Sequence, residues 1–156
     1  MQKEMKFLQE NSTIAIAPYF DGKHSSIILS HQGSFRSKET VERILNCYCL
    51  ENGSSLKGRM DASREIFEFR KNPPILISQL QGVVGLQVPS FTGMGTMWVL
   101  DLNFKIEFSG PGKCKLLYKS GKYLEVPLSA ISLRTRRGRA LELLYSFCIK
   151  RRDTTT

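Results

Sequence analysis

Hydrophobic and polar positions alternate most clearly between Trp98 and Phe108, where every even-numbered residue is apolar. One apolar and one mostly polar face are typical of a half-buried strand in an antiparallel sheet. The pattern therefore predicts one long strand over 98–108. Glycine and proline then turn the chain at 109–112, and shorter returns at 114–118 and 123–126 complete a predicted meander of three strands.

Further strands are predicted where β-branched and aromatic residues lie between turn signals. They cover 13–17, 26–29, 64–70, 75–78 and 83–88, and a turn is expected at 31–34. Residues 1–10 are polar with scattered apolar side chains, which favours either a frayed arm or a first short strand.

A helical period follows these first strands. Ser37 is a suitable N-cap for a helix that begins at Lys38, and Asn52-Gly53 is a suitable C-cap. Its apolar stripe has the spacing i, i+3, i+4 and i+7, and consists of Val41, Ile44, Leu45 and Tyr48.

The C-terminal part of the chain divides into two predicted segments. Residues 129–137 show no periodicity and are expected to form an extended basic connection. From Gly138 onward the apolar residues repeat with a helical period, so a C-terminal helix is predicted. The final 153–156 are expected to be disordered.

These elements predict an α+β fold, one domain over 1–156 that is dominated by antiparallel sheet, with one internal helix and a C-terminal helix. The expected count is two helices and some eight strands. Because no pair of helical patterns is joined by a three- or four-residue turn, a helix-turn-helix protein is not expected.

Charge points to a polyanionic partner. The chain carries a net charge of +9, and the window from Arg134 to Arg152, with seven basic residues against Glu142 alone, contributes +6 of it. Basic charge concentrated in this way favours nucleic acid over an anionic membrane. No apolar run is long enough to span a bilayer, so we expect a cytoplasmic protein without a membrane partner.

The sequence does not favour an enzyme or a metal protein. Its two histidines, His24 and His31, lie near the N-terminus, and no nucleophile elbow or carboxylate cluster accompanies them. Cys47 and Cys49 have the wrong spacing for a zinc knuckle. We therefore expect no catalytic residue, no metal and no cofactor, and reduced structural cysteines.

The segment from Gly53 to Arg59 combines two glycines, two serines, a lysine and an arginine. It is either a surface turn or a flexible anion-binding segment, in which Gly58 lets the main chain approach a phosphate. It is not a nucleotide-binding phosphate loop, because its pattern differs from G-x-x-x-x-G-K-[ST].

Several motifs together resemble one family. They are Gly-Ser-Ser-x-x-Gly-Arg at 53–59, Lys71-Asn72-Pro73-Pro74-Ile75, Trp98, Phe108, Ser120-Gly121-Lys122 and the run 124–129. In this combination the chain resembles the ComK family of bacterial competence transcription factors, over most of its length from about Thr13 to Tyr145.

The resemblance implies a function. Such proteins are DNA-binding activators that recognise A·T-rich promoter boxes through the minor groove, at DNA-uptake genes and at their own promoter. The implied partners are A·T-rich double-stranded DNA on the nucleoid, further copies of the protein, RNA polymerase, and an adaptor with a Clp protease. Relatives often run longer past the C-terminal helix, and weaker activation is expected if that segment touches the polymerase.

Seven basic residues are the candidate DNA contacts: Lys57, Arg59, Arg64, Arg134, Arg136, Arg137 and Arg139. Guanidinium groups bind phosphates directionally and insert into narrow minor grooves. The alternative is that the arginine cluster is merely a solvated surface. A second functional alternative is an RNA- or ribosome-associated protein that stacks bases on an aromatic sheet face, formed by Phe104, Phe108, Tyr118 and Tyr123.

Overall fold

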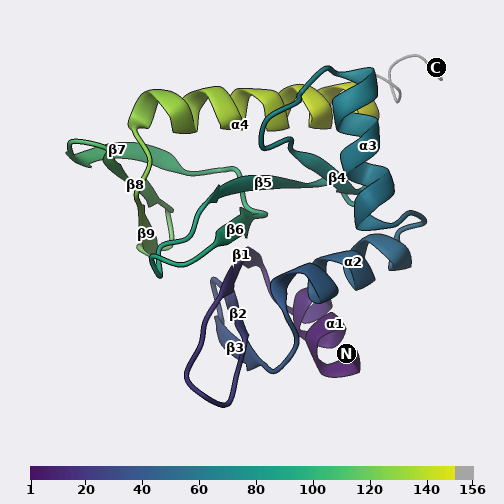
Figure 1. Ribbon diagram of the computed structural model, residues 1–156, viewed down its shortest axis with the longest axis horizontal. Coiled ribbons are helices and arrows are strands. Elements are labelled where there is room, and N and C mark those ends of the chain that lie inside the picture. The colour runs from purple at the N-terminus through teal and green to yellow at the C-terminus, as the bar shows by residue number, and fades with distance from the viewer. Residues whose placement is uncertain (150–156) are drawn as a thin grey trace.

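The fold is α+β, as predicted. The computed structural model describes residues 1–149, which form four α-helices, one π-helical turn and nine strands (Figure 1). In chain order the elements are α1 (Gln2–Glu10), β1 (Thr13–Pro18), β2 (Ser26–Ser30), β3 (Gly33–Ser37), α2 (Val41–Glu51), α3 (Leu56–Ile66), β4 (Ile75–Ser78), β5 (Val83–Pro89), β6 (Thr96–Val99), β7 (Lys105–Gly110), β8 (Lys113–Leu117), β9 (Tyr123–Val126), α4 (Ala130–Leu144) and the π-helical turn η1 (Tyr145–Ile149).

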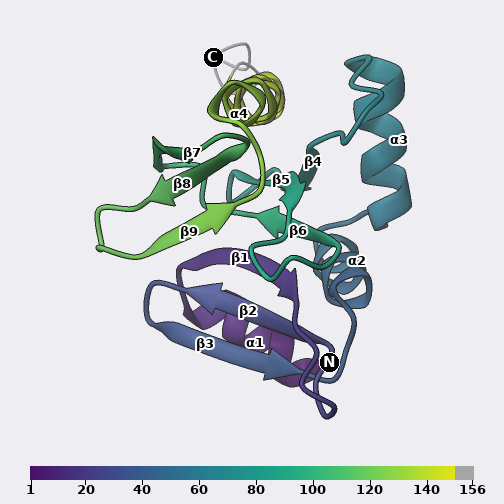
Figure 2. The ribbon, with the colours of Figure 1, turned by 60° about the vertical axis from the view of Figure 1, so that its left-hand side comes forward.

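The strands form two antiparallel sheets. The larger has the order β3-β2-β1-β6-β5-β4, and the smaller is the predicted meander β7-β8-β9. Figure 2 shows α1 behind β2 and β3, with α4 end-on above the smaller sheet. The larger sheet therefore lies between two layers, α1 and α2 on one face and α4 with the smaller sheet on the other.

Both faces of the larger sheet are buried, which explains its weak alternation in sequence. Ile16, Ile28 and Trp98 pack with α1 and α2, whereas Ala15 and Val99 pack in the cluster that includes residues of α4. A strand buried on both faces is continuously apolar, so its sequence shows no period of two.

The prediction of one continuous strand over 98–108 is wrong for residues 100–104. β6 ends at Val99 and β7 begins at Lys105, because the chain leaves the larger sheet here and starts the smaller one. The Asp101 carboxylate accepts a hydrogen bond from the Asn103 N–H at 2.9 Å, which holds the connection in a turn. The period of two thus belongs to two strands in different sheets.

Three predictions for the N-terminal third need correction. Residues 1–10 form neither an arm nor a strand but α1, whose Met5 and Leu8 are buried. Residues 33–37 are strand β3 rather than part of a turn. Helix α2 begins at Val41, because the Thr40 hydroxyl and not Ser37 caps it, accepting from the Arg43 N–H at 3.2 Å. The predicted apolar stripe of α2 is buried as expected.

The segment after α2 is helical, against two predictions. Ser55 caps α3 by accepting from the Gly58 N–H at 3.0 Å, so 53–59 is a helix start rather than a flexible loop. The predicted strand over 64–70 is wrong, since α3 continues to Ile66. Residues 52–55 therefore form a four-residue turn between two helices, α2 and α3, a pair that the sequence patterns had not indicated.

The extended basic connection over 129–137 is also wrong. Ser129 caps α4 by accepting from the Ser132 N–H at 3.2 Å, and the helix runs through the whole basic segment. The tail at 153–156, expected to be disordered, lies outside the described residues.

The four cysteines are free thiols, as expected. Burial raises the pKa of Cys49 to about 11. Within residues 1–149, no cluster of histidine, cysteine and acidic side chains could hold a metal ion. No helix in this part of the chain is long and apolar enough to cross a membrane.

Candidate nucleic-acid interface

Helix α4 carries four of the seven predicted DNA-contact residues, and they lie on different sides of the helix. Its inner side packs Leu133, Ala140 and Leu143 into the core. Arg134 points to solvent on the opposite side. Because successive helical residues are rotated by about 100°, Arg136 lies on the same side as the buried stripe, and Arg137 and Arg139 flank it. All three contact other elements.

Arg137 is held over an aromatic ring. Its guanidinium lies 4.5 Å from the centre of the Phe104 ring and donates a hydrogen bond to the Phe104 carbonyl. This contact links α4 to the connection between the two sheets. It fixes the guanidinium at the wall of a cavity rather than leaving it free in solvent.

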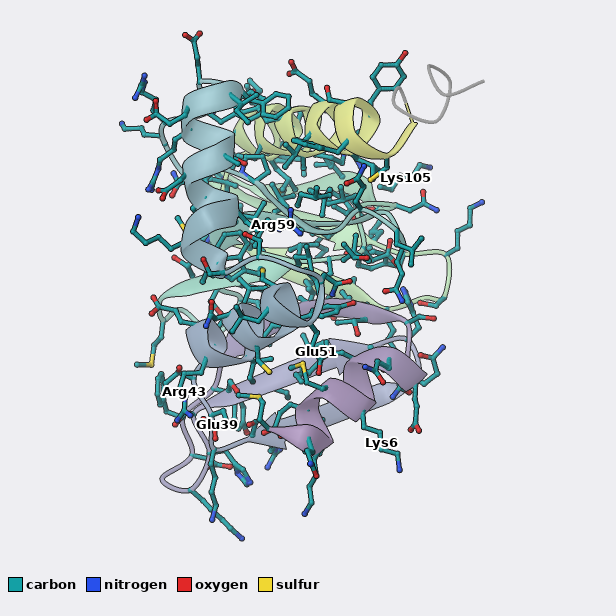
Figure 3. The ribbon with its side chains drawn as sticks, turned by 90° about the vertical axis from the view of Figure 1, so that its right-hand side faces the viewer. Lys6, Glu39, Arg43, Glu51, Arg59 and Lys105 are labelled. Atoms are coloured by element: carbon teal, nitrogen blue, oxygen red, sulfur yellow. The ribbon has the colours of Figure 1, made fainter. Side chains whose placement is uncertain are left out.

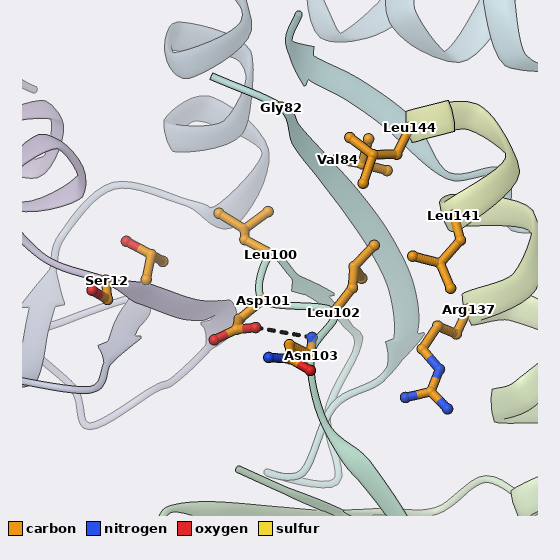
Figure 4. A pocket seen from close by; sticks show the side chains of 11 residues that line it. Ser12, Gly82, Val84, Leu100, Asp101, Leu102, Asn103, Arg137, Leu141 and Leu144 are labelled. Carbon is orange, nitrogen blue, oxygen red and sulfur yellow. Dashed lines mark hydrogen bonds between the residues drawn. The ribbon is translucent and has the colours of Figure 1, made fainter. Parts of the chain in front are cut away.

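That cavity has a volume of about 610 Å³ and lies between α4 and the connection 100–103. In Figure 4, Leu141 and Leu144 of α4 line one wall, and Leu100 and Leu102 line another. The cavity is mostly apolar. Of the polar side chains at its edge, Asp101 is already hydrogen-bonded, to His31 and to the Asn103 N–H.

Arg136 is bound to the larger sheet. Its Nη1 donates to the Gln87 carbonyl of β5 at 3.2 Å. Burial lowers the pKa of the Arg136 guanidinium from its ordinary value, and the positive charge of Arg139 adds to this effect. Arg136 is therefore held against the larger sheet and is only partly open to solvent.

Arg139 lies beside the loop that follows α3. Its guanidinium carbon is 5.9 Å from the centre of the Phe69 ring, and Phe69 stacks on Phe67 at 5.7 Å. The next residues, Arg70 and Lys71, are exposed. The sequence did not indicate this contact, because residues 64–70, which include Phe69, were predicted to form a strand. We call Arg136, Arg139, Arg70 and Lys71 the loop–helix cluster.

The backbone of this loop has two unusual positions. Glu68 and Asn72 have φ angles of 58° and 46°, in the left-handed region that few non-glycine residues adopt. Such conformations persist where the surrounding structure holds them. Phe67 stacks on Phe69 at 5.7 Å and packs at a tilt against Phe147 at 5.6 Å, which supplies that support.

Lys57 and Arg59 in α3 already have partners within the chain. Lys57 forms an ion pair with Asp61 at 2.8 Å. Arg59 donates to the Asn52 carbonyl at 2.9 Å and so caps the end of α2, although its buried Nε has no partner. A β-carbon at Gly58 would lie 2.8 Å from the Ser54 hydroxyl and 3.3 Å from that of the capping Ser55, so this glycine makes room for the two serines before α3.

Arg64 lies in the last turn of α3, at a groove of about 520 Å³ between α2 and α3. Charges on this groove are balanced, because Arg43 pairs with Glu39 at 2.9 Å, just as Lys57 pairs with Asp61. Figure 3 shows Arg43 beside Glu39, and Arg59 well below the level of α4. The structure thus leaves the start of α3 apart from α4, and brings the loop after α3 to it.

A hydrogen-bonded chain of three distant residues was also missed. His31 lies between Asp101 and Ser120, with Nε2 at 2.7 Å from the carboxylate and Nδ1 at 2.7 Å from the hydroxyl. The Tyr118 hydroxyl donates to the Asp101 carbonyl at 2.8 Å. Burial raises the pKa of Tyr118, and the charge of Asp101 raises it further. These hydrogen bonds join three turns from the two sheets, and no local sequence signal could reveal them.

The aromatic sheet face of the RNA alternative does not form. Phe104 and Tyr118 are buried, whereas Phe108 is 71% and Tyr123 is 59% exposed. Phe108 pairs with Cys114, whose row continues to Val126, while Tyr123 pairs with Leu117, three rows further along. Side chains alternate between the two faces from row to row, so rows three apart lie on opposite faces and these two rings cannot form one stacking surface.

Comparison with known proteins supports the resemblance noted in the sequence. The model of the ComK protein family matches residues 4–152, nearly the whole chain. The chain belongs to the ComK family. Membership points to transcription regulation in competence. No curated protein and no solved structure matched the chain in the same comparisons.

Proposed function

We propose that this protein is a transcription activator of competence genes that binds A·T-rich promoter boxes through the minor groove. Family membership supports the class of function. The observation that carries the DNA-binding surface is the loop–helix cluster, where Arg139 lies over Phe69 beside the exposed Arg70 and Lys71.

The proposed surface has two parts. The loop–helix cluster supplies Arg139, which lies at the Phe69 ring, and Arg136, which is held by the Gln87 carbonyl. Guanidinium groups are suited to insertion into a narrow groove. Arg134 and Arg64 extend the positive charge along α4 and α3 to neighbouring phosphates. Arg137 supports this surface from the inside through Phe104. Contacts of Lys57 and Arg59 with the DNA backbone stay a prediction.

In this proposal the protein acts on the nucleoid in the cytoplasm and catalyses no reaction. The partners proposed from the family are RNA polymerase, an adaptor with a Clp protease, and further copies of the chain. No cofactor is needed, because the proposed recognition uses the chain's own guanidinium groups.

A gel-shift series tests the proposal. A duplex with two A·T boxes should bind more tightly than a G·C duplex of equal length, and excess single-stranded RNA should not compete for the bound protein. The logarithm of the binding constant should fall with the logarithm of salt concentration, with a slope of roughly −4 to −6 per protomer. Preferential binding of the RNA would favour the RNA-associated alternative instead.

A further inference from the structure

The cavity between α4 and the connection 100–103 combines two opposite charges with an aliphatic lining. Its volume of about 610 Å³ is in the range of small-molecule sites. Among its lining residues in the described part of the chain, Asp101 and Arg137 carry charge. Figure 4 shows Asp101 on the connection and Arg137 on α4, so the two charges reach the cavity from different elements. The aliphatic lining consists of Val84, Leu100, Leu102, Leu141 and Leu144.

Arg137 is suited to bind a carboxylate in this cavity. Its hydrogen bond to the Phe104 carbonyl uses one of the five N–H donors of a guanidinium group. The guanidinium lies 4.5 Å from the centre of the Phe104 ring, and a guanidinium stacked on an aromatic face keeps donors at its edge. Carboxylates accept pairs of hydrogen bonds from such an edge. Arg137 is thus held in place by Phe104 and retains donors for a ligand.

Asp101 is suited to bind an ammonium group. Its two oxygens are hydrogen-bonded to the His31 ring and to the Asn103 N–H, whereas an ionised carboxylate has about four acceptor positions. The Ser120 hydroxyl can donate to Nδ1 of His31, in which case His31 is neutral and its Nε2–H donates to Asp101. A neutral imidazole does not compensate the negative charge of the carboxylate, so a ligand cation can pair with it.

The aliphatic lining is partly open to solvent. Leu141 is 45% exposed, and Leu100, Leu102 and Leu144 are half-buried. An aliphatic group of a ligand that packs on these side chains removes apolar surface from water on both partners, which favours binding. The cavity therefore fits a molecule with one positive group, one negative group and an apolar body.

We propose that this cavity binds a free amino acid with a large aliphatic side chain, such as leucine. Its ammonium group pairs with Asp101, its carboxylate with Arg137, and its side chain packs on the leucines of the lining. A simple aliphatic acid would leave Asp101 without a cation, and a simple amine would leave Arg137 without an anion. The zwitterion satisfies both charges, so charge complementarity selects it.

Occupation of the cavity has a consequence for DNA binding, and this consequence alone rests on the proposed function. The ligand connects α4, which carries Arg134 and Arg139, to the connection 100–103. Because it holds the helix in place, leucine should raise the affinity for the A·T duplex, and the duplex should raise the affinity for leucine by the same factor. Gel shifts with and without leucine measure this effect. An unchanged duplex affinity would reject this consequence alone, because the site itself is tested without DNA.

Isothermal titration calorimetry with four compounds tests the site. Leucine should bind with one molecule per chain. 4-Methylpentanoate lacks the ammonium group and 3-methylbutylamine lacks the carboxylate, so each should bind more weakly by a factor of about ten or more. Alanine has both charges but little apolar surface, and its affinity should be lower by a factor of about ten or more as well.

Two variants assign each charge of the ligand to its partner. Asp101→Asn should remove the preference for leucine over 4-methylpentanoate and retain the preference over 3-methylbutylamine. Arg137→Gln should do the converse. A general loss of folding would instead lower the affinities for all compounds together, so the two preferences separate direct pairing from a structural effect.

A matched pair of tryptophan variants tests the position of the site. Leu141→Trp fills the cavity and should abolish leucine binding. Ile131→Trp places the same side chain on the same helix at a position that is 76% exposed and does not line the cavity, and should leave binding unchanged. The circular dichroism spectra of both variants should match that of the wild type, because both replaced side chains are exposed.

Absence of leucine binding to the wild type at millimolar concentrations would overturn the proposal. Binding of 4-methylpentanoate or 3-methylbutylamine as tightly as leucine would also overturn it, because the cavity would then recognise a simple acid or a simple amine. Equal leucine affinities of the wild type, Asp101→Asn and Arg137→Gln would contradict the assigned contacts and reject the site.

Discussion

Two basic regions of this protein, the start of α3 and the middle of α4, look similar in sequence but differ in what their charges contact. Lys57 and Arg59 are engaged by an acidic side chain and a helix-end carbonyl. Arg139 instead lies on an aromatic ring next to exposed basic residues, and Arg134 faces solvent. In the first region the charge of Lys57 is paired with Asp61 and Arg59 has a donor in use, whereas the second region presents exposed basic side chains.

The difference concerns the groups around an arginine more than the arginine itself. A carboxylate neutralises the charge, and a carbonyl uses a donor, whereas an aromatic face holds the guanidinium plane and leaves its edge free to donate. Arg136 and Arg137 of α4 also donate to carbonyls. Local contacts therefore make Arg134, Arg139 and the loop after α3 the better candidates for phosphate and groove contacts.

The largest expected effect comes from removing charge at α4. Arg134→Ala with Arg139→Ala should lower affinity for every duplex about 30-fold, if each contact contributes roughly 1 kcal/mol. The salt slope should also become shallower by about 2. Gel shifts at several salt concentrations measure both effects.

The matched control for that variant removes the same charge from α1. Lys3→Ala with Lys6→Ala changes two exposed lysines on another layer of the molecule. An equal loss of affinity in the two double variants would mean that net charge, and not the α4 surface, governs binding.

A smaller effect is expected at α3. Lys57→Ala with Arg59→Ala should weaken all duplexes about equally and by about fivefold, because phosphate contacts position a protein without specifying sequence. The free energy of unfolding should also fall by about 1 kcal/mol, because the Asn52 carbonyl loses its donor. Urea denaturation and gel shifts measure the two effects separately, and Lys57→Ala alone serves as the control for stability. Loss of A·T preference without loss of overall affinity would contradict this account of α3.

The smallest change keeps every charge. Arg136→Lys with Arg139→Lys should retain most non-specific binding but reduce the A·T preference about threefold, because ammonium is more strongly hydrated than guanidinium and loses more on entering a narrow groove. The ratio of affinities for A·T and G·C duplexes measures it. An unchanged ratio would show that these arginines contact phosphates only.

Sequence predicted those parts of the fold whose signals are local. The stripe of α2 and the meander β7-β8-β9 followed from periods that a single element satisfies. The break between Val99 and Lys105 was missed because apolar residues continue through it, some facing one sheet and some the other. Helix α3 was missed because glycine and serines favour a turn, although Ser55 serves as the cap.

The candidate site depended on contacts between distant segments. The concentration of arginines between 134 and 139 was visible, but their segment was predicted to be extended, because charged residues interrupt the apolar period. Nothing in the sequence linked Phe69 to Arg139, which are 70 residues apart. Tertiary packing brought Phe69, in the loop that also carries Arg70 and Lys71, to Arg139 of α4, and local patterns carry no information on such a contact.

The most direct test of the central claim replaces the A·T pairs of the box with inosine·cytosine pairs. These pairs preserve the minor-groove face of A·T pairs, without the guanine amino group, while they change the major groove. Minor-groove recognition predicts that inosine·cytosine boxes bind nearly as tightly as A·T boxes and much more tightly than G·C boxes. Binding no tighter than that of G·C boxes would contradict recognition through the minor groove.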